Sequence, residues 1–217
     1  MKTSGTANPR FITVEGVEGA GKSSNLRFIR ELLERGGREV ITTREPGGTV
    51  LSEQIRDLLL EQRTEGMAPD TELLLMFAAR AEHLDRLIRP ALAAGKWVLC
   101  DRFTDASFAY QGGGRGIDAA RIAQLAQWVH GDFAPGLTLL LDLPVEQGLT
   151  RAGERAEPDR FERERGEFFE RVRARYLDLA ARDPRRFRVI DAAAPLEAVQ
   201  DQLREVLEDW LSANPAA

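Results

Sequence analysis

Short apolar runs alternate along the chain with longer segments in which apolar residues recur every three or four positions. The runs predict five strands, at residues 11–14, 40–43, 97–100, 137–141 and 187–190. Such alternation is typical of βα units, whose strands join into one parallel sheet. Because these strands are apolar throughout, both faces of the sheet should be buried. The pattern therefore predicts an α/β fold with three layers, helix, sheet and helix, around a five-stranded parallel sheet.

The segments of helical period predict where the helices lie. One follows the first strand and stops at Gly36 and Gly37. A long one covers residues 71–89, and Pro90 should end or kink it. The last one, residues 196–210, carries an apolar stripe that should pack on the sheet.

Length and charge limit the class of protein. The 217 residues suffice for one well-buried core, so we expect a single domain at residues 11–212 after a flexible lead at residues 1–10. The net charge of -5 disfavours a nucleic-acid partner. The only cysteine, Cys100, has no disulfide partner in the chain, and no apolar run approaches the roughly 18 residues of a membrane helix. We therefore expect a cytoplasmic protein that binds neither nucleic acid nor membrane.

A glycine-rich loop lies between the first strand and the first helix. Residues 16–23, GVEGAGKS, match the P-loop pattern G-x-x-x-x-G-K-[ST]. Backbone N–H groups and the helix N-terminus of such a loop face the phosphates of a nucleoside triphosphate; Lys22 adds a positive charge, and the Ser23 hydroxyl holds Mg²⁺. The sequence thus predicts a P-loop NTPase whose nucleotide-binding residues are Gly16, Val17, Glu18, Gly19, Ala20, Gly21, Lys22, Ser23 and Ser24.

An acidic residue at a neighbouring strand end helps to organise Mg²⁺ in P-loop enzymes. Asp101 and Asp142 each follow an apolar run. We favour Asp101, because Arg102 puts a guanidinium at the same strand tip. Asp142, two residues before Pro144, is better explained as a residue that initiates a helix. A Ras-type GTPase is excluded, because no asparagine of the chain precedes a lysine as the N-K-x-D motif requires.

Five segments together resemble bacterial thymidylate kinases, which belong to the P-loop nucleoside monophosphate kinases. They are GVEGAGKSS at 16–24, REPGGT at 44–49, FAAR at 77–80, DRF at 101–103 and AYQGGGRG at 109–116. The resemblance spans nearly the whole chain, from Phe11 to about Trp210. It implies that a homodimer with a mobile lid transfers the γ-phosphoryl group of ATP·Mg²⁺ to dTMP, giving dTDP and ADP for dTTP synthesis.

The resemblance also implies where dTMP binds. Arg44, Arg80 and Arg102 line a pocket for the monophosphate and the base, with Arg102 at the phosphate, and Glu18 accepts a hydrogen bond from the sugar 3′-hydroxyl. The residue types agree, since a forked guanidinium suits a phosphate dianion, although Arg80 serves a base carbonyl equally well. The catalytic residues that follow are Lys22, Asp101, Arg102 and Arg155.

Other side chains complete the predicted pocket. Tyr110 lies against the sugar, where its ring can exclude a 2′-hydroxyl, or else packs on the sheet edge. Ser107 and Gln111 supply polar contacts. The ring that stacks on thymine in the family falls at Met76 here, with Phe77 one place later. Either residue is within a helical turn of Arg80 and can reach the base, and either can instead belong to the core.

Residues 150–165 combine arginines and acids with little apolar surface, which predicts an exposed lid. Some thymidylate kinases carry a catalytic arginine in the P-loop, but this loop has none and holds Glu18 instead. The cation that stabilises the transferred phosphoryl group should therefore come from the lid. The candidates are Arg151, Arg155 and Arg160, of which Arg155 matches the family best, whereas Arg163 and Arg165 fit a solvated helix face.

Two other functions are weighed against this one. The first is a P-loop kinase for another nucleoside monophosphate. The second is a nucleotide-binding regulatory module without catalysis, which the intact Lys22, Ser23, Asp101 and Arg102 disfavour.

Overall fold

All five predicted strands form in the computed structural model, which describes residues 7–62, 64–153, 160, 161, 164 and 166–215. The strands are β1 (Ala7–Glu15), β2 (Val40–Arg44), β3 (Trp97–Asp101), β4 (Ala134–Asp142) and β5 (Phe187–Asp191). They pair in parallel in the order β2-β3-β1-β4-β5. β1 is the central strand, with β3 on one side and β4 on the other, so the connections leave it in opposite directions. The loop after β1 therefore lies at a topological switch point, where such sheets bind ligands.

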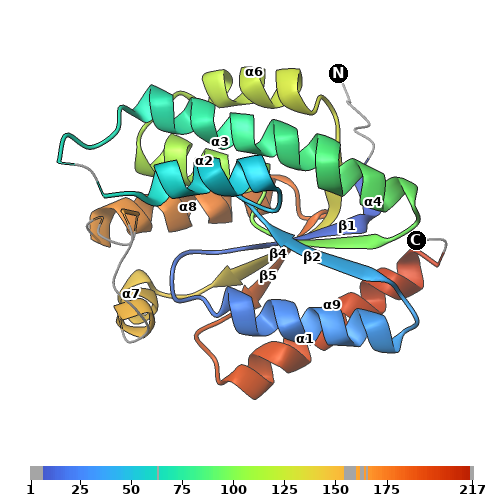
Figure 1. The fold of residues 1–217 in the computed structure, drawn as a ribbon. Helices are drawn as coiled ribbons and strands as arrows, with labels where there is room; N and C mark the ends of the chain where they lie inside the picture. The colour runs from blue at the N-terminus through green and yellow to red at the C-terminus, as the bar shows by residue number, and fades with distance from the viewer. Residues whose placement is uncertain (1–6, 63, 154–159, 162–163, 165, 216–217) are drawn as a thin grey trace.

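Helices cover both faces of the sheet (Figure 1). On one face lie α1 (Lys22–Arg35) and α9 (Leu196–Ala213). On the other lie α2 (Val50–Leu60), α3 (Pro69–His83), α6 (Ala119–Val129) and α8 (Gly166–Arg182). The shorter elements are the π-helical η1 (Leu84–Ile88) and η2 (Phe108–Gly114), with α4 (Arg89–Ala93), α5 (Thr104–Ser107) and α7 (Val145–Gly153). The predicted three-layer α/β fold is confirmed.

All five strands are longer than the apolar runs that predicted them, and the difference is largest for β1 and β4. β1 begins at Ala7 because Ala7 and Asn8 pair with Ala134 and Pro135 of β4. The expectation of a flexible lead over residues 1–10 was therefore wrong for its last four residues, which belong to the sheet. Polar and small residues at a strand end are easily missed, because only the buried middle of a strand has to be apolar.

The long helix does not end at Pro90. The α-helical pattern of α3 gives way to the π-helical turn η1, in which the backbone N–H of Arg89 bonds to the carbonyl of Leu84, and α4 then continues through Pro90. A proline ring clashes with the carbonyl four residues earlier in a regular α-helix. The wider π turn relieves that clash, so the chain stays helical.

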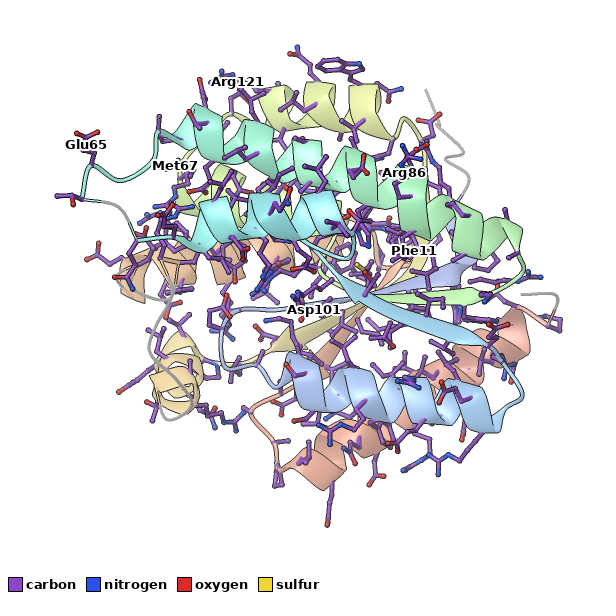
Figure 2. All side chains as sticks on the ribbon, in the orientation of Figure 1. Phe11, Glu65, Met67, Arg86, Asp101 and Arg121 are labelled. Atoms are coloured by element: carbon purple, nitrogen blue, oxygen red, sulfur yellow. The ribbon has the colours of Figure 1, made fainter. Side chains whose placement is uncertain are left out.

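The core has apolar clusters on both faces of the sheet. Strand residues such as Ile12, Leu99 and Leu139 pack with α1 and α9, whereas Phe11 and Val98 on the opposite face pack with η1. Figure 2 shows side chains filling the space between the layers, with Phe11 on β1 and Asp101 at the end of β3. Among the described residues, no helix is both long and apolar enough to cross a membrane.

Candidate active site

The predicted phosphate-binding loop leads directly from β1 into α1. Gly19 has φ +73, and a Cβ there would lie 1.9 Å from the carbonyl oxygen of Gly148, so this position needs glycine and the loop packs directly on α7. The Lys22 Nζ donates to the carbonyls of Gly16 and Val17 at 3.0 and 3.1 Å. Burial, and next Arg102, lowers the pKa of Lys22. Ser23 and Ser24 stand exposed on the first turn of α1.

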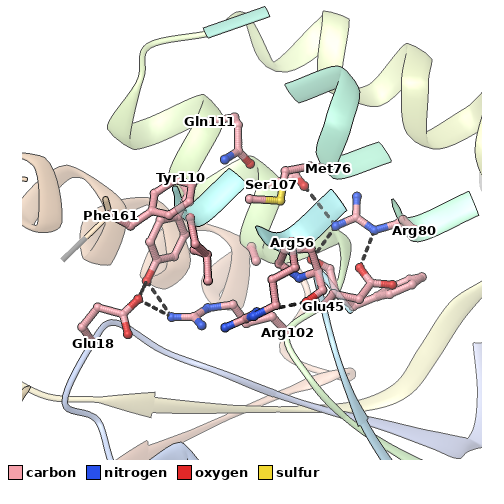
Figure 3. A pocket seen from close by; sticks show the side chains of 14 residues that line it. Glu18, Glu45, Arg56, Met76, Arg80, Arg102, Ser107, Tyr110, Gln111 and Phe161 are labelled. Carbon is pink, nitrogen blue, oxygen red and sulfur yellow. Dashed lines mark hydrogen bonds and ion pairs between the residues drawn. The ribbon is translucent and has the colours of Figure 1, made fainter. Parts of the chain in front are cut away.

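Beside the loop lies a pocket of about 750 Å³, part of it open to solvent (Figure 3). Six predicted substrate residues with polar side chains line it: Glu18, Arg80, Arg102, Ser107, Tyr110 and Gln111. The polar residues Glu45 and Arg56, which the sequence analysis did not select, join them. The apolar part of the wall comes from Pro46, Leu60, Met76, Phe103, Ala106 and Phe161.

One end of the pocket is formed by Glu18, Arg102 and Tyr110. The Arg102 Nη2 donates to Glu18 Oε1 at 2.6 Å and to the Tyr110 hydroxyl at 2.9 Å, and that hydroxyl donates to Glu18 Oε1 at 3.0 Å. Burial alone would raise the pKa of Glu18, but Arg102 and Lys22 lower it to about 2, so Glu18 is a carboxylate. Tyr110 therefore lines the pocket, and of its two predicted placements this excludes the sheet edge.

The backbone at Arg102 is unusual. Arg102 has φ +68, the only positive φ of a residue other than glycine in the described chain. Such a conformation costs energy and persists where the surroundings hold it, often at functional sites. Here the next residue, Phe103, donates its backbone N–H to the buried Glu15 at 2.7 Å. This conformation carries the Arg102 side chain from the end of β3 into the pocket.

The opposite end of the pocket is formed by Arg80 and Gln111. The Arg80 Nε donates to Glu45 at 2.7 Å, and its Nη2 donates to the Phe103 carbonyl and the Ser107 hydroxyl. Within the described part of the chain, the buried Arg80 Nη1 has no partner. The Gln111 Nε2 donates to the carboxylate of Glu72 at 2.9 Å, which leaves the amide oxygen of Gln111 as an acceptor.

Met76 and Phe77 point in different directions. Met76 lines the pocket, whereas the buried Phe77 packs with Leu73, Ile122 and Ala126. The Arg80 guanidinium lies over the Phe77 ring, 4.6 Å from its centroid. Of the two predicted base contacts, Met76 is the one at the pocket wall, and Phe77 supports Arg80 from behind.

Arg44 does not line this pocket, contrary to the prediction. It is exposed and pairs with Glu53 at 2.9 Å, beside a separate hollow. Arg56 on α2 lines the pocket in its place and donates to the Pro46 carbonyl at 3.0 Å. Burial, and then Arg44 and Arg102, lowers the pKa of Arg56. Arg56 lies one helical turn before Leu60, which also lines the pocket, but no sequence motif marks either residue.

Comparison with known proteins identifies the family. Residues 14–203 match the thymidylate kinase family. The thymidylate kinase of Alcanivorax borkumensis is 58% identical over 200 residues, which are 92% of this chain and 96% of that protein. That of Alkalilimnicola ehrlichii is 59% identical over 212 residues, 95% and 98% of the two chains. The crystal structure of thymidylate kinase from Ehrlichia chaffeensis matches with a TM-score of 0.75 at 35% identity, covering 91% of this chain and 97% of that one.

The chain belongs to the thymidylate kinase family. The resemblance found in the sequence is confirmed, and so are the function and the enzyme class that it implied, an ATP-dependent phosphotransferase. Because relatives this similar over nearly their whole length are thymidylate kinases, the alternative of a regulatory module that only binds nucleotide is rejected.

A thymidylate kinase also needs a site for the metal that accompanies its nucleotide. Ser23 and Asp101 line one hollow together, next to the pocket. The buried Asp101 Oδ1 has no hydrogen-bond partner among the residues that the structure describes, as expected of an oxygen reserved for a ligand.

Asp142 has a different role from the predicted one. It is the last residue of β4, and α7 begins three residues later, at Val145. The Asp142 carboxylate accepts both a 2.7 Å and a 2.9 Å hydrogen bond from Arg173. The prediction that Asp142 initiates a helix was therefore wrong: it joins β4 to α8.

Two of the three lid arginines are bound to neighbouring elements. Arg151 donates to the carbonyls of Ala192 and Ala193, after β5. Arg160 donates to the Leu59 carbonyl at 2.8 Å and pairs with Glu72 at the same distance. Arg155, with Arg163 and Arg165, lies outside the described residues. Phe161, also in the predicted lid, contacts the Tyr110 ring at 6.1 Å and closes that side of the pocket.

Glu15, just before the loop, is a buried acid that the sequence analysis missed. It accepts hydrogen bonds from the Phe103 backbone N–H and the Tyr176 hydroxyl, both at 2.7 Å. Burial, with Asp105 next in effect, raises the pKa of Glu15 from 4.5 to about 8. At neutral pH, Glu15 is therefore largely protonated in the folded enzyme.

This raised pKa predicts how stability changes with pH. Between pH 5 and 8 the folded Glu15 keeps a proton that the unfolded chain releases, so the free energy of unfolding should fall as pH rises, by about 1 kcal/mol per pH unit or less. Glu15→Gln should remove this slope: its amide oxygen can accept from the Phe103 N–H, and its amide nitrogen can donate to the Tyr176 hydroxyl oxygen. Urea unfolding at several pH values measures it, and Glu208→Gln, at an exposed position on α9, controls for the loss of a carboxylate. A slope that Glu15→Gln leaves unchanged would contradict the assignment.

Proposed function

We propose that the pocket binds dTMP beside the phosphate-binding loop, which presents ATP, so that the γ-phosphoryl group passes to dTMP and gives dTDP and ADP in dTTP synthesis. The observation that carries this proposal is a pair of polar groups at the end of the pocket. The Arg80 Nη1 is a donor without a partner among the described residues, and the Gln111 amide oxygen beside it is an acceptor, because the Gln111 Nε2 is committed to Glu72. Thymine offers the complementary pair, an acceptor at O4 and a donor at N3–H.

The other end of the pocket suits the sugar and the phosphate. Arg102 and Arg56 both line the pocket, and two guanidinium groups in one site favour a dianion. Glu18, ionised and beside Tyr110, would accept a hydrogen bond from the sugar 3′-hydroxyl. The Tyr110 ring would lie where a 2′-hydroxyl has to fit.

For ATP, the loop residues and Lys22 would hold the β and γ phosphates. Ser23 and Asp101 would hold Mg²⁺, which neutralises the charge that develops on the phosphates. The chain's own contribution is to orient the two nucleotides and to exclude water, without a covalent intermediate.

The substrate is tested by measuring ADP release with dTMP, dUMP, dCMP, UMP, CMP, AMP and GMP as acceptors. We expect the highest kcat/KM with dTMP. A clear preference for another acceptor would make the chain a kinase for that nucleotide. Tight ATP binding without turnover on any acceptor would indicate a regulatory module.

We further propose that the chain forms a homodimer through α2, α3 and α6. These helices lie side by side on the outer surface (Figure 1) and expose apolar side chains, with Trp128 and Val50 each 82% exposed and Leu74 56% exposed. Exposed apolar surface that extends over neighbouring helices is typical of a protein–protein interface. A cytoplasmic location fits the single cysteine, Cys100, which is buried and reduced.

Sedimentation measures the assembly directly. The wild-type chain should sediment as a dimer, and Trp128→Glu combined with Leu74→Glu should sediment as a monomer. Val189 on β5 is 50% exposed but lies on a different element, so Val189→Glu should remain dimeric. A dimer that survives the double substitution would place the interface elsewhere.

A further inference from the structure

A buried chain of polar side chains runs behind Arg80 and away from the pocket. The Thr43 hydroxyl lies 2.7 Å from the His83 Nε2, and the His83 Nδ1 lies 3.1 Å from the Glu45 Oε1. The Glu45 Oε2 in turn accepts from the Arg80 Nε at 2.7 Å. All four side chains are buried, and His83 is completely inaccessible.

The charge of Glu45 fixes the direction of its own hydrogen bonds. Burial raises the pKa of Glu45, but Arg80 and His83 outweigh it, and the pKa lies below its usual value. The Glu45 carboxylate therefore only accepts, so the His83 Nδ1 must be its donor. The His83 Nε2 bonds to the Thr43 hydroxyl on the far side of the ring, so both ring nitrogens have a partner.

The same chain leaves Arg80 very little freedom. Its Nε is held by Glu45, and its Nη2 by Phe103 and Ser107. Its guanidinium lies against the rings of Phe77 and Phe103, with centroids at 4.6 and 5.3 Å. Figure 3 shows Glu45 and Ser107 on different sides of the guanidinium. Only Nη1 remains for a ligand among the contacts that the structure describes.

His83 gives Glu45 its second anchor. Without the His83 Nδ1, the Glu45 Oε1 would be a buried charged oxygen lacking its partner, and the carboxylate would reorient to find another donor. Gly48 packs directly against the Thr43 end of this chain, since a Cβ there would lie 2.4 Å from the Thr43 hydroxyl and 2.5 Å from the His83 Nε2. His83 itself lies too deep to touch a nucleotide.

We propose that His83 is a positioning residue which, by holding Glu45, fixes the Arg80 guanidinium and thereby sets the preference of the pocket for pyrimidines with a carbonyl at position 4 over those with an amino group. This inference rests on the proposed function. A guanidinium can only donate hydrogen bonds. A rigid Arg80 Nη1 can therefore donate to the O4 oxygen of thymine, but it would face another donor in the 4-amino group of cytosine. A loose Arg80 would discriminate less.

Two substitutions distinguish the contact of the His83 Nδ1 with Glu45 from that of the Nε2 with Thr43. His83→Asn places its amide nitrogen near the position of Nδ1 and can still donate to Glu45. His83→Gln places its amide near Nε2 and reaches only toward Thr43. We expect His83→Gln to raise KM for dTMP about tenfold with kcat nearly unchanged, because a base contact acts equally in the ground and transition states. The dTMP preference over dCMP should fall by a similar factor, and His83→Asn should restore most of both.

Ser52 supplies the matched control. Its buried hydroxyl donates to the Ala79 carbonyl at 2.9 Å, so it joins α2 to α3 next to Arg80 without touching the guanidinium. Ser52→Ala should lower the thermal midpoint and leave the dTMP preference over dCMP unchanged. An equal loss of preference in Ser52→Ala and His83→Gln would show that His83 only stabilises the fold. Thr43→Val, which removes the far end of the chain, should change the preference in the same direction if His83→Gln does not fold.

A readout without substrate separates this inference from the proposed function. The ¹⁵N–¹H signal of the Arg80 Nε–H, assigned by its loss in Arg80→Lys, reports the Glu45 contact. It should shift and broaden in His83→Gln and stay near its wild-type position in His83→Asn. A signal unchanged in His83→Gln would overturn the positioning role. A wild-type enzyme that prefers dCMP would instead overturn the proposed base recognition, whatever the signal does.

Discussion

Arg102→Ala is expected to lower kcat/KM for dTMP by about 10³-fold. Arg102 is the half-buried arginine at the end of the pocket that also holds Glu18 and Tyr110, and it follows Asp101 at the tip of β3. Two charge-assisted hydrogen bonds to a phosphate dianion contribute about 4 kcal/mol together, which corresponds to the expected factor. Steady-state kinetics with dTMP as the varied substrate measures it.

The geometry explains why no neighbour should replace Arg102. Arg56 lines the same pocket, but one of its nitrogens is committed to the Pro46 carbonyl. Arg102, in contrast, has a buried Nε without a partner among the described residues and a backbone conformation that directs it inward. Its present partner, Glu18, would release part of the guanidinium when a dianion arrives.

Three variants decide whether the loss comes from the phosphate contact. Arg102→Lys keeps the charge but not the fork, so it should recover only part of the activity. Arg204→Ala, which removes an exposed arginine paired with Asp201 on α9, should leave kcat/KM unchanged. A loss below tenfold in a well-folded Arg102→Ala enzyme would assign the phosphate to Arg56.

The sequence predicted the fold and the loop well because both depend on local patterns. Apolar runs located all five strands, and the P-loop motif needs only a strand, a turn and a helix in order. The terminal residues of β1 and β4 were not predicted as strand, because they are strand by pairing with a neighbour and not by their own composition. The π turn before Pro90 was not predicted either, because it relieves a local clash that the apolar pattern does not show.

The pocket was harder to predict because it depends on which way a side chain points. Arg44 lies between Thr43 and Glu45, and successive residues of an extended chain point to opposite sides. Thr43 and Glu45 face His83, which sends Arg44 toward Glu53 and out of the pocket. Met76 and Phe77 are one step apart on a helix, about 100° in rotation, and both are apolar, so only the packing of α3 separates them. Arg56 and Glu45 reach the pocket from segments far from its other residues in the sequence.

Arg155→Ala is expected to lower kcat by about 10²-fold and to leave the affinity for dTMP nearly unchanged, as for a contact made mainly in the transition state. The loop carries Glu18 where some relatives carry an arginine, and Lys22 is its only cation. Charge spread over the transferred phosphoryl group therefore calls for a second cation from outside the loop. Single-turnover kinetics and dTMP titration measure the two quantities separately.

Arg151 and Arg160 provide the controls, because the structure shows what each one holds. Arg151→Ala should loosen the attachment of α7 to the segment after β5, and Arg160→Ala should remove one of the two arginines that pair with the buried Glu72, so both should lower the thermal midpoint more than kcat. A 10²-fold loss of kcat in Arg151→Ala with none in Arg155→Ala would move the catalytic role to Arg151. The kcat of Arg155→Lys should lie between those of Arg155→Ala and the wild type if the transition state needs only the positive charge. It should equal that of Arg155→Ala if the transition state needs the planar guanidinium.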